Sequence, residues 1–341
     1  MIIVRYRGGL GNQMFQYAFS YALSKRFPNE EILADVTHYE LHNEHNGFEL
    51  EKCFNINIPK APKAILKKYS PYYVPGTGYS LLVKPIRHLI SNNLQFKYYE
   101  NRKEEIASYV KYYKQKYHNT YDETIFEQIS RYLVQNSTEN EEKSGITENS
   151  ENAKQQGDEK IVYLDGLWQN IRYFDEYREE LRDIFGISHD ISEENSVGIH
   201  VRCGDFLHSK FDICGKEYYR KSIDELSKLL PSNSIDKEDR KGLDLQYYVY
   251  TDDIVKAMET LQDNTKIYKY INSGIQSSLN DMIAMSQCEN LIISNSTFAF
   301  WAAYLGNPKT VICPKYSVIK PDESFELYAP NNWIVINNKS I

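Results

Sequence analysis

The sequence predicts an α/β fold of two doubly wound domains with a cleft between them, and three observations lead to this prediction. The chain has 341 residues, which exceeds what one hydrophobic core usually supports, since single cores stop growing at roughly 250–300 residues. It opens with a strand, a glycine-rich loop, a helix and a second strand, an order that indicates a parallel sheet covered by helices. The same alternation returns in the second half. We therefore expect one domain over residues 1–190 and another over residues 191–341.

The first domain begins with a buried strand over residues 2–6 and a glycine turn, GGLGNQ, over residues 8–13. Apolar residues at helical spacing then predict a helix over residues 14–27, which Pro28 ends. The next expected strand is EILADV, residues 31–36.

The middle of the first domain carries two unusual segments. Residues 60–135 are rich in lysine and tyrosine and contain helix-like runs, so we expect a basic helical insertion there. Residues 136–160 have almost no apolar side chain to bury, and such a segment cannot offset its ordering entropy, so we expect disorder. A strand and turn over residues 161–170 and a helix over residues 172–185, ended by Gly186, then restore the α/β order.

The second domain repeats strands and helices in alternation, and polar residues follow directly after its strands. Folds of this kind bind ligands at that edge of the sheet. The expected strands cover residues 196–206, 246–253, 290–296 and 310–314, the last of them being the final strand, and the expected helices cover residues 218–230, 254–261, 281–288 and 297–306.

Composition and charge exclude several classes of protein. The formal net charge of −7 argues against nucleic acid as the main partner, because phosphate binding usually requires a basic excess. The five cysteines are scattered and form no C-x-x-C pair, so we expect neither a disulfide framework nor a structural zinc site. We find no signal-peptide core and no apolar run long enough to span a membrane, and we expect a cytoplasmic protein.

The glycine loop at residues 8–13 is the first candidate for ligand binding. Its backbone N–H groups and the start of the following helix can face an anion or a sugar without interference from side chains. A dinucleotide fingerprint would need a third glycine where Met14 stands, and a P-loop would need Gly-Lys-Ser/Thr, which is absent. The alternative is a glycine turn that serves only tight packing.

The motif HVRCGD contains the sharpest cluster of polar residues. Strand alternation places His200 and Arg202 on one face, near the carboxyl end of the strand. A guanidinium suits a diphosphate, because its planar fork donates two charge-assisted hydrogen bonds and stays charged. Asp205 is a candidate to accept a proton. The alternative is an internal ion pair between Arg202 and Asp205 that only closes the loop.

The motif Thr251-Asp252-Asp253 follows the next strand. Its acids either contact a ligand or cap the following helix, since Thr and Asp are good N-cap residues. A divalent-ion site is disfavoured, because no second acidic cluster stands beside this motif.

The segment 281–305 places polar residues at two helix starts. Asp281 opens one helix, and Ser296 and Thr297 open the other, where hydroxyls and free N–H groups can hold an anion. We expect core packing for the aromatic residues that follow, namely Phe298, Phe300 and Trp301.

Four motifs together carry a family resemblance. In order and spacing, GGLGNQMFQYA, HVRCGD, TDD and DMIAMSQCENLIISNSTFAFWAAYL resemble the α-1,2-fucosyltransferases of glycosyltransferase family 11, of the bacterial type. The resemblance covers residues 1–55 and 161–316 and skips the middle. It implies a GT-B-like fold of two Rossmann-like domains, the first on the acceptor side and the second binding GDP-fucose.

The resemblance also implies roles for individual residues of the second domain. Arg202 looks like the arginine that holds the β-phosphate of GDP, and His200 like a histidine near the guanine and ribose. Asp281 is similar to an aspartate that pairs with the guanine edge, while Ser296 and Thr297 match hydroxyls on the β-phosphate. The family usually has a second arginine where this chain has Cys203, which costs a supporting contact.

In the first domain, Gly11 and Asn12 match the loop that closes over phosphate and fucose. The other residues expected to contact the donor come from the two loops already described, namely Gly9, Gln13, Asp252 and Asp253.

The resemblance implies an inverting transfer of L-fucose from GDP-β-L-fucose to the 2-hydroxyl of a terminal β-galactose. We expect Arg202, N–H groups and hydroxyls to stabilise the departing GDP without a metal cofactor, with Asn12 completing the catalytic set. Asp205 is the first candidate for the general base, followed by His208 and Asp212. Alternatives are a related transferase with another GDP-sugar donor, or a non-catalytic protein that binds nucleotide sugars or glycans.

Residues 60–116 carry twelve lysines and arginines against three acids. One interpretation is contact with anionic lipid at the inner face of the membrane, so that a lipid-linked glycan can act as acceptor. A solvated helical face is the other. The expected partners are thus GDP-fucose and a β-galactoside, with no nucleic acid.

Overall fold

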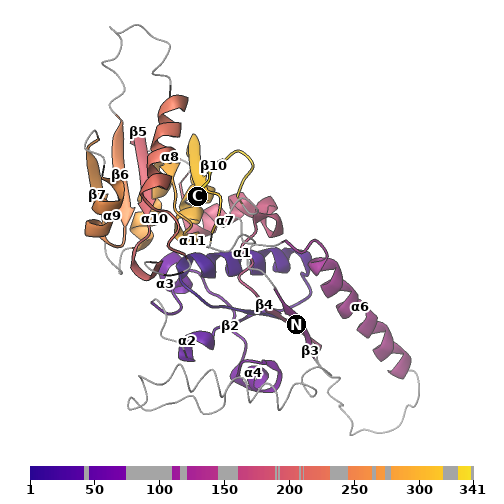
Figure 1. The fold of residues 1–341 in the computed structure, drawn as a ribbon. Coiled ribbons are helices and arrows are strands. Elements are labelled where there is room, and N and C mark those ends of the chain that lie inside the picture. The colour runs from indigo at the N-terminus through magenta and orange to yellow at the C-terminus, as the bar shows by residue number, and fades with distance from the viewer. Residues whose placement is uncertain are drawn as a thin grey trace, which may run out of the picture.

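The computed structural model contains two parallel β-sheets, each in its own lobe and each flanked by helices (Figure 1). The strands of the first sheet lie between residues 2 and 165, and those of the second between residues 193 and 336. The structure describes residues 1–41, 46–73, 110–115, 121–144, 160–188, 190, 193–206, 209, 211–230, 245–262, 266–272, 278–317 and 329–338.

The first sheet has the parallel order β2-β1-β4-β3, so β1 and β4 lie side by side at its centre. Helix α1 (Leu10–Arg26) covers one face, on which Ile2 and Val4 are buried, and α4 (Lys63–Tyr69) covers the other, on which Ile3 is buried. The strands are β1 (Ile2–Arg5), β2 (Ile32–Asp35), β3 (Val110–Lys114) and β4 (Ile161–Asp165).

The second sheet has the parallel order β10-β9-β8-β5-β6-β7. The chain enters at the centre with β5, adds β6 and β7 on one side and then β8, β9 and β10 on the other. This is a doubly wound, Rossmann-like order, with its topological switch point between β5 and β8. The strands are β5 (Glu193–Val201), β6 (Gln246–Thr251), β7 (Tyr268–Ile271), β8 (Cys288–Ile292), β9 (Thr310–Pro314) and β10 (Ile334–Ile336).

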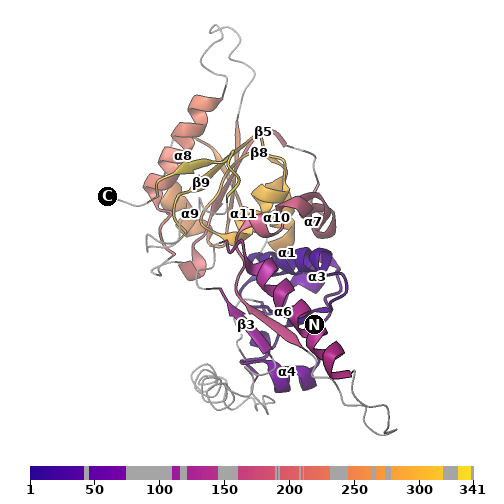
Figure 2. The same ribbon diagram turned by 90° about the vertical axis from the view of Figure 1, so that its right-hand side faces the viewer.

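Helices cover both faces of the second sheet (Figure 2). Those on one face pack against Val197, Ile199 and Val201 of β5, and these are α8 (Lys216–Leu229) and α9 (Ile254–Leu261). Those on the other face are α10 (Ser278–Ser286) and α11 (Thr297–Leu305). The remaining helical elements are α2 (His38–Leu41), α3 (Leu50–Phe54), α6 (Ile125–Ser144), η2 (Ile171–Tyr173), η3 (Asp175–Tyr177), α7 (Arg178–Phe185) and η4 (Gly204–Phe206).

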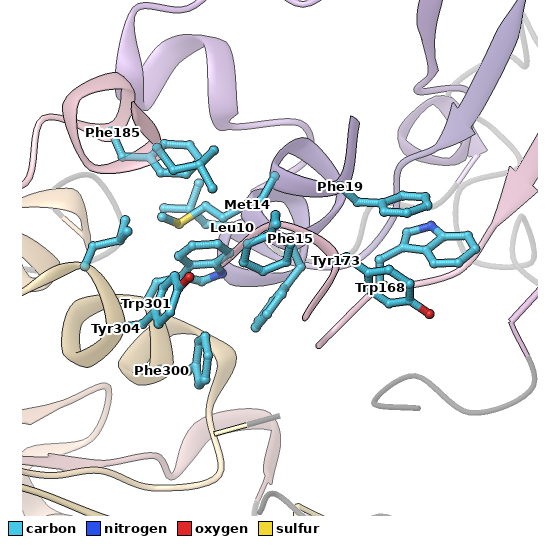
Figure 3. Close-up of a cluster of buried hydrophobic side chains, with 14 of the residues drawn as sticks. Leu10, Met14, Phe15, Phe19, Trp168, Tyr173, Phe185, Phe300, Trp301 and Tyr304 are labelled. Carbon is cyan, nitrogen blue, oxygen red and sulfur yellow. The ribbon is translucent and has the colours of Figure 1, made fainter. Parts of the chain in front are cut away.

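The two lobes share one hydrophobic cluster, built where α1 meets α11 (Figure 3). The ring of Phe15 lies 4.8 Å from that of Trp301 and 5.0 Å from that of Phe300. Trp301 donates its Nε1–H to the carbonyl oxygen of Gly11, at 2.9 Å. The expected core packing is confirmed for Phe300 and Trp301, which are fully buried, while Phe298 is half-buried.

Several expected boundaries differ in the structure. Helix α1 begins at Leu10 rather than at residue 14, because the Gly9 carbonyl already accepts the N–H groups of Asn12 and Gln13, at 2.9 and 3.0 Å. Helix α7 begins only at Arg178, after two short 3₁₀ turns, although it ends at Gly186 as predicted, with φ +64°. Strand β9 is not the last, because β10 pairs with it.

The middle of the first lobe also differs from expectation. Strand β3 lies inside the segment 60–135, for which the sequence predicts helices, and it completes the sheet beside β4. Helix α6 continues to Ser144, into the segment for which disorder is predicted, because extending a helix whose start is buried through Ile125 and Ile129 costs little. Residues 74–109, 116–120 and 145–159 lie outside the described residues. Among the helices that are described, none is long and apolar enough to cross a membrane.

Candidate functional site

Four loops that follow the central strands of the two sheets define the candidate site. In doubly wound folds, ligands bind outside the carboxyl ends of the strands at the topological switch point. The loops after β1 and β4 meet this condition in the first lobe, and those after β5 and β8 meet it in the second. A Cβ atom on Gly11 would lie 2.6 Å from Thr297 Oγ1 and 2.7 Å from Phe298 N. The glycine thus allows the loop after β1 to touch the start of α11.

His200 and Arg202 point away from the face of β5 that packs on α8 and α9, as strand alternation predicts. His200 Nδ1 lies 2.8 Å from Ser294 Oγ, and its ring centroid lies 5.9 Å from that of Phe298 at the start of α11. Burial, and to a smaller extent the charge of Arg202, lowers the pKa of His200 to about 3. The imidazole is therefore neutral at ordinary pH and acts as a hydrogen-bonding group, not as a cation.

Arg202 forms an ion pair with Asp252 at the end of the neighbouring strand, with 3.0 Å between Nη1 and Oδ2. The other carboxylate oxygen of Asp252 accepts the N–H of Cys203, at 2.8 Å. A Cβ atom on Gly204 would collide with Asp252 Oδ2, so a larger residue there would displace this carboxylate. Asp252 thus orients both Arg202 and the turn after β5.

Cys203 is buried in the core that β5 forms with α8. Burial, followed by the charge of Asp252, raises the pKa of its thiol to about 11. The thiol is therefore protonated and inert, and the position is apolar.

The start of α11 is capped by Ser296, whose Oγ accepts the N–H of Phe298 at 3.3 Å and keeps its own O–H to donate. Thr297 is half-buried at the contact with Gly11. Asn295 holds the loop from beneath by donating to the carbonyl oxygens of Phe211, at 3.0 Å, and Ser317, at 2.8 Å.

Two residues expected to contact a ligand make hydrogen bonds within the protein. Asp253 caps α9, accepting the N–H of Lys256 at 3.0 Å, which is the alternative that the sequence left open. Gln13 is fully buried. Its Nε2 donates to Gly8 O and Gly47 O, at 3.0 and 2.8 Å, and its Oε1 accepts the N–H groups of Glu49 and Leu50. Its amide is therefore saturated by the protein.

Most of the other expected residues lie in helices or in the loops next to them. Gly9 is the N-cap of α1, and Asp281 lies half-buried in the first turn of α10. Burial raises the pKa of Tyr250, and the Cys288 thiol and the charge of Asp281 add smaller effects in the same direction. Asp281 and Tyr250 are therefore neighbours. Asp205 lies in η4, three residues after Arg202, and Asp212 is exposed in the loop that follows. His208 lies outside the described residues.

Two side chains of this site are not among the residues expected from the sequence. Ser294, after β8, is the partner of His200. Gln169, after β4, donates from Nε2 to Asn12 Oδ1 at 2.6 Å and so joins the loops after β4 and β1. Both follow an apolar strand, which is the same signal that identified Arg202 and Asp252.

A second charged cluster lies on the face of the first sheet covered by α4. Arg5 Nη1 is 3.3 Å from Asp165 Oδ1, and its guanidinium carbon lies 3.5 Å from the ring centroid of Tyr72. Tyr72 and Tyr112 donate to Asp165 Oδ2, at 2.6 and 3.1 Å. Burial alone would raise the pKa of Asp165, but Arg5, Arg7 and the hydrogen bonds from the two tyrosines together outweigh it and hold this pKa below its usual value. Across the described ranges, no three His, Cys, Asp or Glu side chains group in a way that could hold a metal ion.

A model of glycosyltransferase family 11 matches residues 101–337. The chain is similar to an α-1,2-colitosyltransferase of Escherichia coli, with 27% identity over 325 residues that cover 90% of this chain and 88% of the relative. It is also similar to the O-antigen biosynthesis glycosyltransferase WbnK of Escherichia coli, with 24% identity over 98% of this chain and 95% of the relative.

Among solved structures, the chain is similar to the NodZ α-1,6-fucosyltransferase soaked with GDP-fucose. The TM-score is 0.40 at 16% identity, over 90% of this chain and 96% of the other. The fold itself is defined by the two parallel sheets of this chain.

Proposed function

The chain belongs to glycosyltransferase family 11 and is a glycosyltransferase, and from this premise we propose that it transfers L-fucose from GDP-β-L-fucose to the 2-hydroxyl of a terminal β-galactose. The observation that carries the proposal is the position of Arg202, at the switch point of the second sheet and half-exposed beside its partner Asp252. A glycan acceptor is supported by the O-antigen relative, and a fucosyl donor by the α-1,2-fucosyltransferases that also match, such as that of Mus musculus.

On this proposal, the second lobe stabilises the charge that develops on the departing GDP. Arg202 contributes a fixed cation, Ser296 an O–H donor, and the start of α11 its unpaired N–H groups. Removing one such donor typically costs roughly 2.7–4 kcal/mol of barrier. Because these groups already offset the charge, we propose that the reaction needs no divalent cation.

We propose that His200 binds the guanosine part of the donor and takes no proton from the acceptor. With its pKa lowered to about 3, the imidazole is a poor base at neutral pH. Attack on the β-linked donor from the opposite face requires a base there to give the α-linked product. Asp205 remains our first candidate for that base, with His208 and Asp212 behind it.

A second candidate function is the transfer of colitose. It is favoured by one observation, the similarity over 90% of the chain to a protein named as an α-1,2-colitosyltransferase. The roles that we propose for Arg202, His200 and Ser296 are contacts with the nucleotide part of the donor. A different sugar on the same nucleotide would leave these roles unchanged.

A donor panel tests the proposal. Purified protein is incubated with lactose and with GDP-fucose, GDP-colitose or GDP-mannose, each with EDTA and with added Mg²⁺. We expect fucosyl transfer at the same rate in both buffers, with an α-1,2 linkage by NMR. Exclusive use of GDP-colitose would move the assignment to the second candidate, and loss of transfer in EDTA restored by Mg²⁺ would contradict the metal-free mechanism.

Contact with anionic lipid remains a proposal that rests on the basic composition of residues 60–116 alone, most of which lie outside the described residues. Flotation with vesicles rich in anionic lipid at low salt tests it, and a protein that stays at the bottom of the gradient contradicts it.

A further inference from the structure

The bond between Gln169 and Asn12 leaves one unused polar group on each side chain. Gln169 Nε2 donates to Asn12 Oδ1 at 2.6 Å, and both side chains are half-buried. Within the part of the chain that the structure describes, Asn12 Nδ2 and Gln169 Oε1 have no hydrogen-bond partner. A single bond between two amides always leaves one N–H donor and one C=O acceptor, whichever way the amides are oriented.

The backbone around Gln169 is held rigidly in an unfavourable conformation. Trp168 has φ +55°, a region that bulky residues rarely adopt. The Gln115 Oε1 atom accepts the N–H groups of Leu167 and Trp168, at 3.1 and 3.0 Å, and the indole stacks on Phe19 with ring centroids 4.2 Å apart. Backbone strain maintained in this way is typical of functional loops, because it places the next side chain in one position.

The position of the pair relates it to the donor site. Asn12 lies in the first turn of α1, next to Gly11, which touches Thr297 at the start of α11. Gln169 lies on the first-lobe side of this contact, after β4. The pair therefore lies on the first-lobe side of the contact between Gly11 and the start of α11.

We propose that the Asn12–Gln169 amide pair binds a sugar hydroxyl, with the free N–H donating to the hydroxyl oxygen and the free C=O accepting its proton. A hydroxyl both donates and accepts, which matches this donor and acceptor placed side by side. The inference rests on the proposed function and adds Gln169 to it as a sugar-binding residue. The hydroxyl belongs either to the transferred sugar or to the acceptor, and the two arms of the experiment distinguish these sources.

The experiment compares wild type with Gln169→Ala, using analogues that lack single hydroxyls. Monodeoxy lactoses form the acceptor arm, and a deoxy analogue of GDP-fucose forms the donor arm. We expect Gln169→Ala to lower kcat/KM for the parent substrates about tenfold, the loss of one neutral hydrogen bond. The analogue that lacks the bound hydroxyl has no such hydrogen bond to lose. The variant and the wild type should therefore react equally well with that one analogue, in one arm only.

The control is Gln128→Ala, which removes another glutamine whose Nε2 donates to a side-chain oxygen, that of Thr124, in an exposed hydrogen bond at the start of α6. We expect it to behave as wild type. A merely structural role for Gln169 would lower the rates for all substrates by the same factor, preserving every parent-to-analogue ratio, and that result would overturn the proposal.

Calorimetric binding separates this inference from the proposed function. Binding of GDP-fucose, lactose and the deoxy analogues of both to wild type and Gln169→Ala is measured without turnover. If wild type binds the sugars and transfers none, the proposed function fails, and the affinity ratios between parent and analogue still decide the amide pair. If wild type binds none of them, both proposals fall.

Discussion

The first strand of each sheet ends in the same arrangement, and the two copies differ in what surrounds them. Strand β1 ends at Arg5, which pairs with Asp165 at the end of the neighbouring β4. Strand β5 is followed by Arg202, which pairs with Asp252 just past the neighbouring β6. In both cases an arginine at a strand end meets an aspartate from the adjacent strand end.

Burial separates the two pairs. The side chains of Arg5 and Asp165 are 10% and 2% exposed, and Tyr72 and Tyr112 occupy the remaining carboxylate oxygen. Those of Arg202 and Asp252 are 29% and 27% exposed. A saturated buried pair is costly to open and holds structure, whereas a half-exposed pair can exchange its partner for a ligand anion. The same strand-end pattern thus serves the fold in one lobe and, we propose, donor binding in the other.

The largest expected effect breaks the buried pair. Arg5→Met leaves the buried Asp165 carboxylate with two phenols and the more distant Arg7, whose Nε lies 3.6 Å from Asp165 Oδ1, and should lower the free energy of unfolding by about 3–5 kcal/mol. Urea denaturation followed by circular dichroism measures this. The matched control is Lys25→Met, which removes an exposed ion pair with Glu180 and should cost less than about 1 kcal/mol. Equal effects of both substitutions would contradict the structural role of Arg5.

The next effect concerns the half-exposed pair. Arg202→Ala should lower kcat/KM by about 100- to 1,000-fold, because it removes the preorganised cation that we propose stabilises the departing GDP. The free energy of unfolding should change by less than about 1 kcal/mol, since the pair is partly solvated. Initial rates and urea denaturation on the same preparation measure both. Arg220→Ala, on the exposed face of α8, is the control for removing an ion-paired arginine. Turnover retained in Arg202→Ala would remove this residue from the site.

The residue two places before each arginine sharpens the comparison. Ile3 occupies this place in β1 and His200 in β5, both buried. The pKa of His200 is lowered to about 3 from 6.5, so between these values the unfolded chain binds a proton that the folded chain does not. The free energy of unfolding contributed by His200 therefore rises with pH through this window and is constant above it.

Lowering the pH from 6.5 to about 5 should accordingly reduce the free energy of unfolding of the wild type by roughly 2 kcal/mol more than that of His200→Gln. Urea denaturation curves at several pH values measure the two slopes. Identical slopes below pH 6.5 would show that the imidazole is not desolvated as the structure has it.

Local sequence patterns predicted the elements that can be identified from their own residues, without knowing what packs against them. Apolar runs located β1, β4, β6 and β9, and alternation placed His200 and Arg202 on one face. Strand β3 was missed, because its residues VKYYK look polar until Ile161 and Tyr163 of β4 pack beside them. Helix α1 was predicted to begin too late, because two adjacent glycines are typical of a turn. In the structure, the Gly9 carbonyl accepts the first hydrogen bonds of the helix.

The site shows the same division between local and tertiary information. The sequence named the polar residues past the strands, but it did not distinguish those that contact one another from those that face a ligand. Gln13 is saturated by a backbone segment more than thirty residues away, around Gly47 and Glu49. Gln169 meets Asn12 across 157 positions of the chain, a pairing that no spacing reveals.

The smallest effect tests whether Asp252 acts on the ligand or on Arg202. Asp252→Asn keeps an oxygen for the N–H of Cys203 and removes the charge that holds Arg202, so we expect about a tenfold loss of kcat/KM. If Asp252 acts only by positioning Arg202, the double variant with Arg202→Ala should be no worse than Arg202→Ala alone, since there is then no cation left to orient. If Asp252 contacts the donor itself, as its place after the strand predicts from sequence, the two losses should multiply. The coupling measured in this cycle therefore decides whether the second strand-end pair works as a unit, as the buried first pair does, or as two separate ligand contacts.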